Sequence, residues 1–358
     1  MHRALELAEK ARGYTSPNPM VGAVIVKNGR IVAEGYHRRA GSEHAEVVAL
    51  RKAGRRARGA TIYVTLEPCC HVGCTGPCTE AIIDAGISRV VYASLDPNPI
   101  VRGKGDRRLR QAGLAVARGI LRSQAEELNE AYYLFYRLGR PFVTLKMAET
   151  IDGRIATVTG DSQWISSPES LKFAHKLRAV NDAVMVGAGT VRADNPALTV
   201  RLVKGKNPYR IVVAGREELP SNCQVLANNH DLKTVVAEAG RSHRPSPQNK
   251  RASGLVRWEL KADRRGRLDL QDLLEKAAAF GLQSILVEGG SALATALLKA
   301  KLVDKVVLVI APKMIGHGTP VIGDLGIKKL ADGIVLAGVK VRQLGPDVVV
   351  SGYPKYKI

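Results

Sequence analysis

The chain has 358 residues, of which 45% are hydrophobic and 24% are charged, and its formal net charge is +21. This composition is typical of a globular protein long enough for two domains, each with its own core. It excludes a membrane protein, because no apolar run approaches the roughly 20 residues that a membrane-spanning helix needs. The densest basic groups, at 55–58 and 264–267, are short and lack interleaved aromatic residues. We therefore predict no nucleic-acid partner, and a phosphorylated small molecule accounts for part of the charge as well.

The five cysteines indicate a cytoplasmic protein. Four of them, Cys69, Cys70, Cys74 and Cys78, fall within ten residues, whereas a disulfide framework would spread them along the chain. The first residues form an amphipathic pattern with charges throughout, and no secretory signal is evident. In the cytoplasm thiols stay reduced, so this cluster is available to bind a metal.

The first third of the chain alternates between helix and strand patterns. Two apolar runs, 21–27 and 30–36, flank Asn28-Gly29, a strong hairpin signal. Ser42 could cap a helix over 43–53, a strand follows at 60–67, and a helix over 78–84 stops at a glycine. A strand at 89–95, a helix ending near 111, a short strand and a long helix over 122–137 complete a layered α/β domain with helices on both faces of one sheet.

The break at Gly139-Arg140-Pro141 marks the predicted domain boundary, which gives domains 1–140 and 141–358. The second part repeats the alternation of strands and helices. Its clearest predicted strands are 141–148, 182–187, 209–215, 284–290 and 305–312. The segment 240–254 has the composition of a loop.

His44, Cys69 and Cys78 are predicted to hold one catalytic zinc ion. His44 stands at the start of one helix, Cys69 follows a strand, and Cys78 opens the next helix. One imidazole and two thiolates leave the fourth tetrahedral position open for water. The positive end of a helix favours the thiolate that zinc requires. The alternative is a closed structural zinc site built from Cys69, Cys70, Cys74 and Cys78. Their spacing lacks the two C-x-x-C pairs that are usual in such sites, and that site leaves the H-x-E motif unexplained.

Glu46 is the predicted proton shuttle of this site. It lies two residues after His44 on the same helix, close enough to reach the water without binding the metal. Zinc lowers the pKa of bound water from about 16 towards 7, and a carboxylate beside it can move protons to a ring nitrogen and a leaving amine. H-x-E followed by P-C and a second cysteine is the arrangement of zinc deaminases, so the predicted reaction is hydrolytic deamination of a nucleobase-like ring.

Two asparagine-proline loops are candidate walls of this site. Asn18 precedes the first strand, and Asp96-Pro97-Asn98-Pro99 follows a later one. Loops at the carboxyl ends of strands line the sites of α/β sheets, and an amide both donates and accepts hydrogen bonds. Taken alone, the same residues favour plain turn chemistry over a role in the site.

At this point the chain resembles a known family. The segments that carry the resemblance are SPNPMVGAVIV, AGSEHAEVVAL, VTLEPCCHVGCTGPC and SLDPNPIVRGKG in the first part, and KMAETIDGRIAT, GDSQWISSP, VMVGAGTVRADNPALTVR, ILVEGGSALATALL and VDKVVLVIAPKMIG in the second. Together they are similar to the bifunctional deaminase–reductase family of riboflavin biosynthesis. Eight residues separate Cys69 from Cys78, as in that family, whereas base and nucleoside deaminases generally have P-C-x-x-C.

The resemblance implies two three-layer α/β/α domains, the first cytidine-deaminase-like and the second dihydrofolate-reductase-like. It implies zinc-dependent deamination of 2,5-diamino-6-(5-phosphoribosylamino)pyrimidin-4-one, followed by NADPH-dependent reduction of the ribosyl side chain to ribityl phosphate. The partners implied are a small pyrimidine ribotide and other copies of the chain in a homo-oligomer. His44, Cys69 and Cys78 would hold zinc, Glu46 would shuttle protons, and Asn18, Asp96 and Asn98 would face the pyrimidine.

For the second domain, the residues alone say less. No G-x-G-x-x-G opens a βαβ unit, and the fragment at 187–190 favours a tight turn. The glycines of 287–291 fit either anion binding or close packing. The resemblance supplies the contacts. Residues implied to bind NADPH are Ala148, Trp164, Thr190, Asp194, Gly215, Gly290, Ser291, Ala292, Leu293, Ala294, Thr295 and Ala296. Residues implied to bind the substrate are Ser162, Arg178, Leu198, Arg201 and Glu288.

The sequence departs from the family pattern at two places. Cys74 stands where the family commonly has a loop lysine, so His71 or Arg102 would have to contact the substrate phosphate. Ala214-Gly215 stands where Asp-Ser is frequent, which bears on the adenosine side of NADPH. Two other interpretations remain open from the zinc motif alone: a tRNA-editing deaminase and a non-enzymatic zinc module. The reductase motifs argue against the first. Removal of zinc separates the second, because it would unfold a zinc-stabilised module but leave the fold of a zinc enzyme standing.

Overall fold

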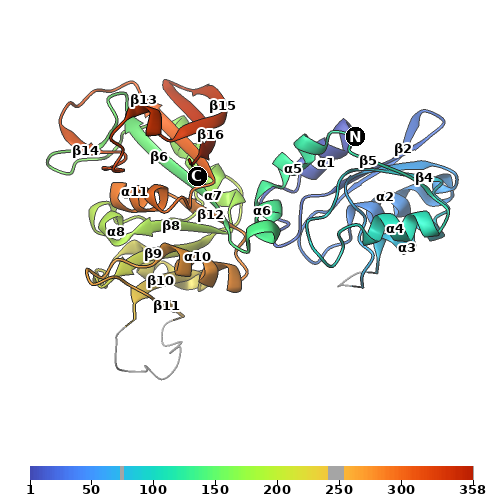
Figure 1. Cartoon of the computed structure of the whole chain (residues 1–358), viewed down its shortest axis with the longest axis horizontal. Helices are drawn as coiled ribbons and strands as arrows, with labels where there is room; N and C mark the ends of the chain where they lie inside the picture. Colours follow the sequence, from blue (N-terminus) through green and yellow to red (C-terminus); the bar gives the residue numbers. More distant parts are fainter. Residues whose placement is uncertain (73–75, 241–253, 358) are drawn as a thin grey trace. The chain divides into compact units, whose positions relative to one another are not determined.

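The computed structural model describes residues 1–72, 76–240 and 254–357. It divides into two compact units, Met1–Gly139 and Arg140–Ile358, which are described separately (Figure 1). The predicted loop at 240–254 falls, apart from its two end residues, outside the described residues, and so does Cys74. In the described part of the chain, no helix has both the length and the apolar character needed to cross a bilayer.

Unit 1 contains one mixed sheet with helices on both of its faces. The elements are α1 (His2–Glu9), β1 (Gly22–Lys27), β2 (Arg30–Tyr36), α2 (Ala45–Ala53), the 3-10 helix Gly54–Ala57, β3 (Thr61–Leu66), α3 (Cys78–Asp84), β4 (Arg89–Ser94), α4 (Lys104–Gln111), β5 (Ala115–Arg118), α5 (Arg122–Leu128) and α6 (Glu130–Leu138). The strand order is β2-β1-β3-β4-β5. The β1–β2 and β1–β3 pairs are antiparallel, and the β3–β4 and β4–β5 pairs are parallel.

Alternation along the strands of unit 1 sends neighbouring side chains to opposite faces of the sheet. Ile25 packs with α2, α3 and α4, whereas Val24 packs with α1. The predicted hairpin is confirmed, because Asn28 and Gly29 join β1 to β2 with positive φ angles of 51° and 76°. Because β3 and β4 are parallel, their carboxyl ends lie at the same edge of the sheet. Cys69 follows β3 at this edge, and the Asp96 loop follows β4.

The predicted long helix over 122–137 is wrong in one respect: it is two helices, α5 and α6, separated by Asn129. The Asn129 side chain accepts a hydrogen bond from the backbone N–H of Met20 (2.7 Å) and donates one to the backbone carbonyl of Met20 (2.9 Å). The helix breaks because this tertiary contact fixes Asn129 with φ −112°. The break ties α6 to the loop that carries Asn18.

Unit 2 contains a nine-stranded sheet and a small two-stranded one. The elements are β6 (Phe142–Thr150), β7 (Arg154–Thr157), α7 (Pro168–Val180), β8 (Ala183–Gly187), α8 (Ala188–Asp194), β9 (Tyr209–Gly215), α9 (Gln224–Ala227), the 3-10 helix Asn229–Asp231, β10 (Thr234–Ala239), β11 (Val256–Leu260), α10 (Leu270–Ala279), β12 (Ser284–Val287), α11 (Ser291–Lys299), β13 (Lys305–Ala311), β14 (Gly318–Pro320), the 3-10 helix Leu330–Asp332, β15 (Val335–Leu344) and β16 (Asp347–Lys355).

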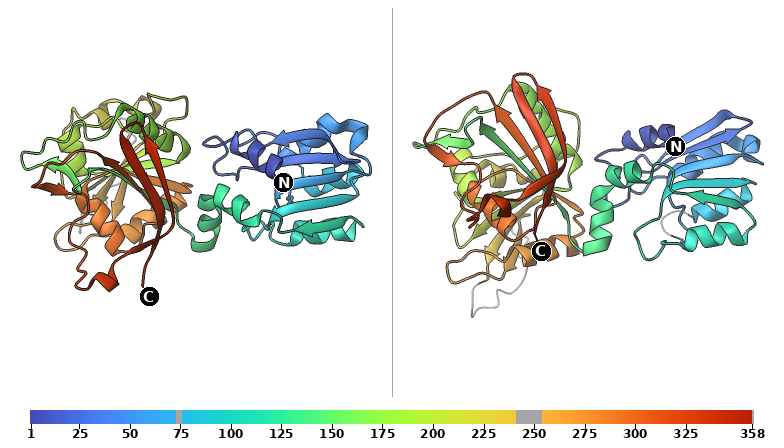
Figure 2. Two further views of the ribbon diagram at one scale, coloured as in Figure 1. Left: turned by 90° about the horizontal axis from the view of Figure 1, so that it is seen from above. Right: turned by 45° about the horizontal axis from the view of Figure 1, so that its top comes forward.

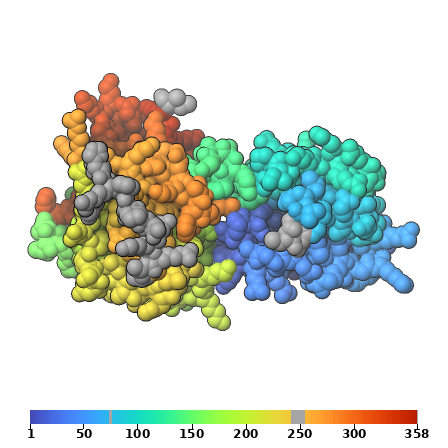
Figure 3. Space-filling model, turned by 90° about the horizontal axis from the view of Figure 1, so that it is seen from below, coloured from blue at the N-terminus to red at the C-terminus, as the bar shows by residue number. Residues whose placement is uncertain are grey.

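The large sheet has the order β11-β10-β9-β8-β12-β6-β13-β16-β15. In this order, the strands from β11 through β10, β9, β8, β12 and β6 to β13 are all parallel to their neighbours. Strands β16 and β15 add an antiparallel edge, which is visible in Figure 2. Helices α10 and α11 pack on one face with Leu145 and Met185, and α7, α8 and α9 pack on the other. One face of this unit, formed largely by the yellow and orange segments between β9 and α11, is seen in Figure 3.

Candidate functional sites

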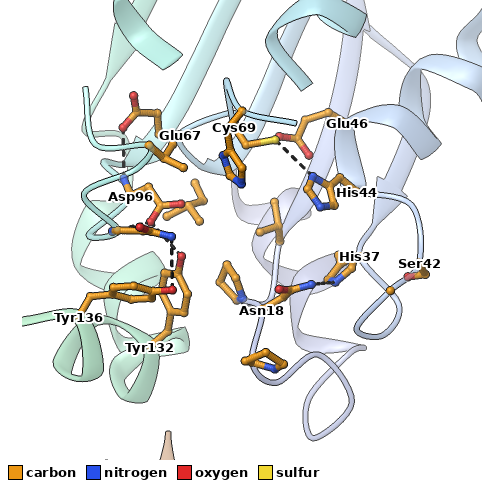
Figure 4. A pocket seen from close by; sticks show the side chains of 18 residues that line it. Asn18, His37, Ser42, His44, Glu46, Glu67, Cys69, Asp96, Tyr132 and Tyr136 are labelled. Carbon is orange, nitrogen blue, oxygen red and sulfur yellow. Dashed lines mark hydrogen bonds between the residues drawn. The ribbon is translucent and has the colours of Figure 1, made fainter. Parts of the chain in front are cut away.

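The predicted zinc ligands come together in unit 1. His44 is the N-cap of α2, Cys69 follows β3, and Cys78 is the first residue of α3. Their ligand atoms lie within 4.8 Å of one another, and His44 Nδ1 is 3.1 Å from Cys78 Sγ and 3.5 Å from Cys69 Sγ. Figure 4 shows His44, Cys69 and Glu46 together at the closed end of a pocket. Among the described residues, the group consists of His44, Cys69 and Cys78, without Cys70.

The electrostatics of the two thiols fit a bound cation. Hydrogen bonds from Cys78 and from the imidazole of His44 lower the pKa of Cys69 to about 4. The neighbouring Cys69 and burial raise the pKa of Cys78, because a second thiolate would stand beside the first. A positive ion between the two sulfurs would offset this repulsion and favour the ionised form of both. The donor set of one nitrogen and two sulfurs, on three different elements, suits zinc.

Glu46 stands where the sequence predicted the proton shuttle. Glu46 is 4% exposed and belongs to the first turn of α2. It lines the same pocket as His44 and Cys69. Burial raises the pKa of Glu46 to about 7, so the carboxyl can both take up and release a proton near neutral pH.

Asn18 reaches the pocket and is held there by His37, which the sequence analysis missed. The Asn18 amide Nδ2 is 3.2 Å from His37 Nε2, and His37 Nδ1 is 3.1 Å from the Glu43 carbonyl oxygen. His37 is buried, and burial lowers its pKa, so its ring is neutral. It also stacks edge-on against the ring of His44 with centroids 5.5 Å apart.

Asp96 and Asn98 line the opposite wall, where they contact α6 (Figure 4). Asp96 Oδ1 accepts hydrogen bonds from the Tyr132 hydroxyl (3.0 Å) and the Asn98 backbone N–H (2.8 Å). The Asn98 amide donates to the Tyr136 hydroxyl (3.3 Å), and its oxygen accepts from the Ile100 N–H (3.0 Å). Both interpretations of this motif therefore apply at once: the residues make a turn, and they line the pocket.

Glu67, the residue before the Pro68-Cys69 pair, organises the loop behind this wall. Its buried carboxylate accepts three backbone N–H groups, from Asp96 (3.3 Å), Gly103 (3.0 Å) and Asp106 (3.0 Å). A side chain at Gly105 would overlap the Pro68 carbonyl oxygen, at 2.1 Å. The sequence placed Glu67 at the strand end but gave no sign of these distant partners.

The residues considered as replacements for the family's loop lysine are exposed. His71 lines the pocket, and Arg102 lies on the surface of the loop between β4 and α4. Cys70 is half-buried, and burial raises its pKa, so it remains a thiol.

In unit 2 the predicted substrate residues Arg178 and Glu288 form a partly buried ion pair. Arg178 Nε lies 2.9 and 3.0 Å from the two carboxylate oxygens, and Arg178 Nη1 donates to the Thr199 carbonyl (3.2 Å). Burial opposes the ionisation of Glu288, but Arg178 outweighs it, so the pKa of Glu288 lies below its ordinary value. Lys146, on β6, is a third charge that the sequence analysis missed: burial lowers its pKa, and Glu288 opposes that shift.

Eight of the residues predicted to hold NADPH lie at the amino end of α11: the run 290–296, and Thr190 beside it. Gly289 and Gly290 have φ angles of 110° and 78°, and a Cβ at Gly290 would come 3.0 Å from Thr190 Oγ1. Leu293 and Ala294 are buried in the core, which anchors the first turn of α11. The first N–H groups of a helix have no partner within it, so this turn offers donors to a ligand. Such a turn fits a phosphate group of a dinucleotide. Thr295 instead binds the Ser291 carbonyl and the Gly323 N–H, while Ala292 and Ala296 are exposed.

The other predicted reductase residues occupy several places. Ser162 donates to Asp194 (3.0 Å), and Trp164 is exposed, with its carbonyl accepting from Lys313 (2.6 Å). Ala148 lies on β6, two residues after Lys146 and on the same face. Gly215 ends β9 with φ 63°, and a Cβ there would meet the Gly266 carbonyl oxygen at 2.7 Å.

Leu198 and Arg201 belong to one irregular segment that begins after α8. The Leu198 side chain is buried in a cluster with β8 and β9, so this residue can offer a ligand only its backbone. Arg201 is exposed, and its Nη1 donates to Thr199 Oγ1 (2.8 Å). Within the described part of the chain, no carboxylate pairs with Arg201.

Comparison with known proteins decides the family. The sequence-family model of the RibD C-terminal domain matches residues 141–350. The family model of the cytidine and deoxycytidylate deaminase zinc-binding region matches residues 1–94. The riboflavin biosynthesis protein RibD of Aquifex aeolicus is 46% identical over 98% of this chain and 96% of its own length. The RibD of Escherichia coli is 43% identical over 97% of this chain and 96% of its own.

The chain belongs to the RibD family. Two solved structures agree: RibD of Acinetobacter baumannii (TM-score 0.90, 35% identity) and the Thermotoga maritima protein titled diaminohydroxyphosphoribosylaminopyrimidine deaminase/5-amino-6-(5-phosphoribosylamino)uracil reductase (TM-score 0.84, 36% identity). In both comparisons, the matched region covers 99% of this chain and 97% of the chain in the solved structure. Like other RibD proteins, it is a bifunctional enzyme of riboflavin biosynthesis, with a zinc-dependent deaminase and an NADPH-dependent reductase. Its fold, cytidine-deaminase-like in the first part and reductase in the second, is as predicted.

Proposed function

We propose that residues 1–140 remove the amino group at C2 of 2,5-diamino-6-(5-phosphoribosylamino)pyrimidin-4-one, and that residues 141–358 then reduce the ribosyl side chain of the product to a ribityl chain. The observation that carries this proposal is the meeting of His44, Cys69 and Cys78 beside the buried carboxyl of Glu46. The same chain supplies an ion pair and a phosphate-binding helix end in unit 2.

For deamination, His44, Cys69 and Cys78 would hold zinc, which when bound lowers the pKa of a water molecule towards 7. Glu46 takes the proton of that water and returns protons to the ring nitrogen and to the departing ammonia. Asn18 and Asp96 contact the edge of the pyrimidine from opposite walls of the pocket. The depth of Glu46 in the pocket supports this division of roles, because the reacting ring carbon must lie beside it.

For reduction, the first turn of α11 and Thr190 bind NADPH, which when bound supplies a hydride. The ribosylamine opens to an imine, and the carboxylate of Glu288 stabilises the cation that forms. Arg178 holds Glu288 in place, and Lys146 is positioned to donate a proton to the opening sugar. Since Arg178 already binds Glu288 and Thr199, Arg201 is the arginine with a guanidinium available for the sugar phosphate.

We further infer that the enzyme acts in the cytoplasm, as a homo-oligomer, on the free ribotide and not on nucleic acid. Its unpaired cysteines suit a reducing compartment. The edge strand β15 exposes Val335, Val339 and Val341, an apolar surface that a second copy would cover. Light scattering tests the assembly, and a monomer at micromolar concentration would contradict it.

The test of the proposed function is an assay of the purified chain with the diamino ribotide. We expect ammonia to be released without NADPH, and NADPH to be oxidised only after deamination. Oxidation of NADPH by the diamino substrate before any ammonia appears would contradict the order of steps.

A further inference from the structure

The segment that carries Arg201 has no regular secondary structure, and side chains hold its backbone in place of a strand partner. Arg178 binds the Thr199 carbonyl (3.2 Å), and Asn207 accepts from the Val200 N–H (2.9 Å). The third contact comes from His175, whose Nδ1 lies 2.9 Å from the Arg201 N and 3.5 Å from the Leu202 N. Three successive residues are thus each fixed by one polar side chain.

His175 and Arg178 lie one turn apart on α7 and so project from the same side of the helix. A backbone N–H can only donate, so Nδ1 of His175 is the acceptor and the ring is neutral, with its proton on Nε2. His175 is 5% exposed, and both burial and the nearby Arg178 and Arg201 favour this neutral form. His175 thus holds the same segment that Arg178, a member of the ion pair with Glu288, holds at Thr199.

We propose that His175 is a positioning residue for the reductase: its Nδ1 fixes the backbone of Arg201 so that this guanidinium stands at the phosphate of the ribotide. The inference rests on the proposed function, in which Arg201 binds that phosphate. His175 itself touches neither substrate nor cofactor. Its loss therefore weakens phosphate binding and leaves the hydride-transfer groups in place.

Two polar substitutions separate this role from general packing. In His175→Asn the amide oxygen can occupy the place of Nδ1, whereas in His175→Gln the polar group lies further out, near the place of Nε2. We expect His175→Gln to raise the KM for the deaminated ribotide about tenfold, the effect of losing one hydrogen bond. We expect kcat and the KM for NADPH to change less than about twofold, and His175→Asn to keep the wild-type KM. Lys176→Gln, on the exposed side of α7, is the matched control.

The phosphate dependence is measured with Arg201→Ala and with the double variant. If His175 acts through Arg201, His175→Gln adds no further increase in KM to Arg201→Ala. Equal KM values for His175→Gln and the wild type, or an equal loss in His175→Asn and His175→Gln, would overturn the inference. A wild-type KM in Arg201→Ala would instead overturn the proposed phosphate contact, and the two failures are therefore distinguishable.

Discussion

The side chain of Asn18 donates a hydrogen bond to Nε2 of His37, at 3.2 Å. A carbonyl oxygen only accepts, so the contact of His37 Nδ1 with the Glu43 carbonyl (3.1 Å) places the ring proton on Nδ1. Nε2 is then an acceptor, the amide of Asn18 is oriented, and its oxygen remains for a donor on the pyrimidine. We predict that His37→Ala raises the KM of deamination about tenfold while one zinc per chain is retained. Metal analysis beside steady-state kinetics checks this, and loss of zinc would contradict it.

Removal of zinc is expected to stop ammonia release without unfolding the chain, because the ion occupies an open catalytic site and each unit has its own hydrophobic core. Circular dichroism before and after chelation measures the fold. Cys69→Ser and Cys78→Ser should lose the metal, whereas Cys70→Ser should keep it. Retention of zinc in the first two variants would show that other residues bind it.

Glu67→Gln is expected to destabilise unit 1 by about 2–4 kcal/mol. The carboxylate accepts three backbone N–H groups, two on Oε2 and one on Oε1. In glutamine an NH₂ group replaces one of these oxygens, so at least one backbone N–H loses its acceptor and faces another donor. The matched control is Glu80→Gln, which breaks an exposed ion pair with Arg108 and should cost less than about 1 kcal/mol. Chemical denaturation followed by circular dichroism gives both values, and equal losses would refute the role of Glu67.

Acid should weaken unit 2 through His175. Burial, with Arg178 and Arg201, lowers its pKa to about 4 from an ordinary value near 6.5. Because the unfolded chain then binds the proton more tightly, the stabilising contribution is present above pH 6.5 and is lost as the pH falls towards 4. The loss amounts to at most about 3 kcal/mol. Both tryptophans, Trp164 and Trp258, belong to unit 2, so their fluorescence reports its unfolding. The His175→Asn variant should lack this part of the acid sensitivity, and an unchanged pH profile would contradict the assignment.

The sequence predicted the elements and contacts that depend on local patterns. The hairpin at Asn28-Gly29, the helix that starts at Cys78 and the ligands themselves all follow from spacing and turn chemistry. Contacts between distant segments carried no such signal: the hydrogen bonds of Asn129 to Met20 split a predicted helix. One local prediction was also wrong, because Ser42 binds the backbone of Arg39 in a turn instead of capping α2.

The same limit explains the residues that were missed around the sites. His37 follows directly after β2 and Lys146 lies inside β6, and only the fold brings them to Asn18 and Glu288. The resemblance implied that Arg178 binds the substrate, and the structure shows that Glu288 and Thr199 already occupy most of its guanidinium.

The most direct test of the account is Glu46→Gln, assayed at both steps. We predict that ammonia release from the diamino ribotide falls by about 10²–10⁴-fold, the usual contribution of a general acid–base group. One zinc per chain should remain bound, and NADPH-dependent reduction of the deaminated ribotide should proceed at the wild-type rate. Ammonia release at the wild-type rate in this variant would show that Glu46 is not the proton shuttle and would contradict the mechanism.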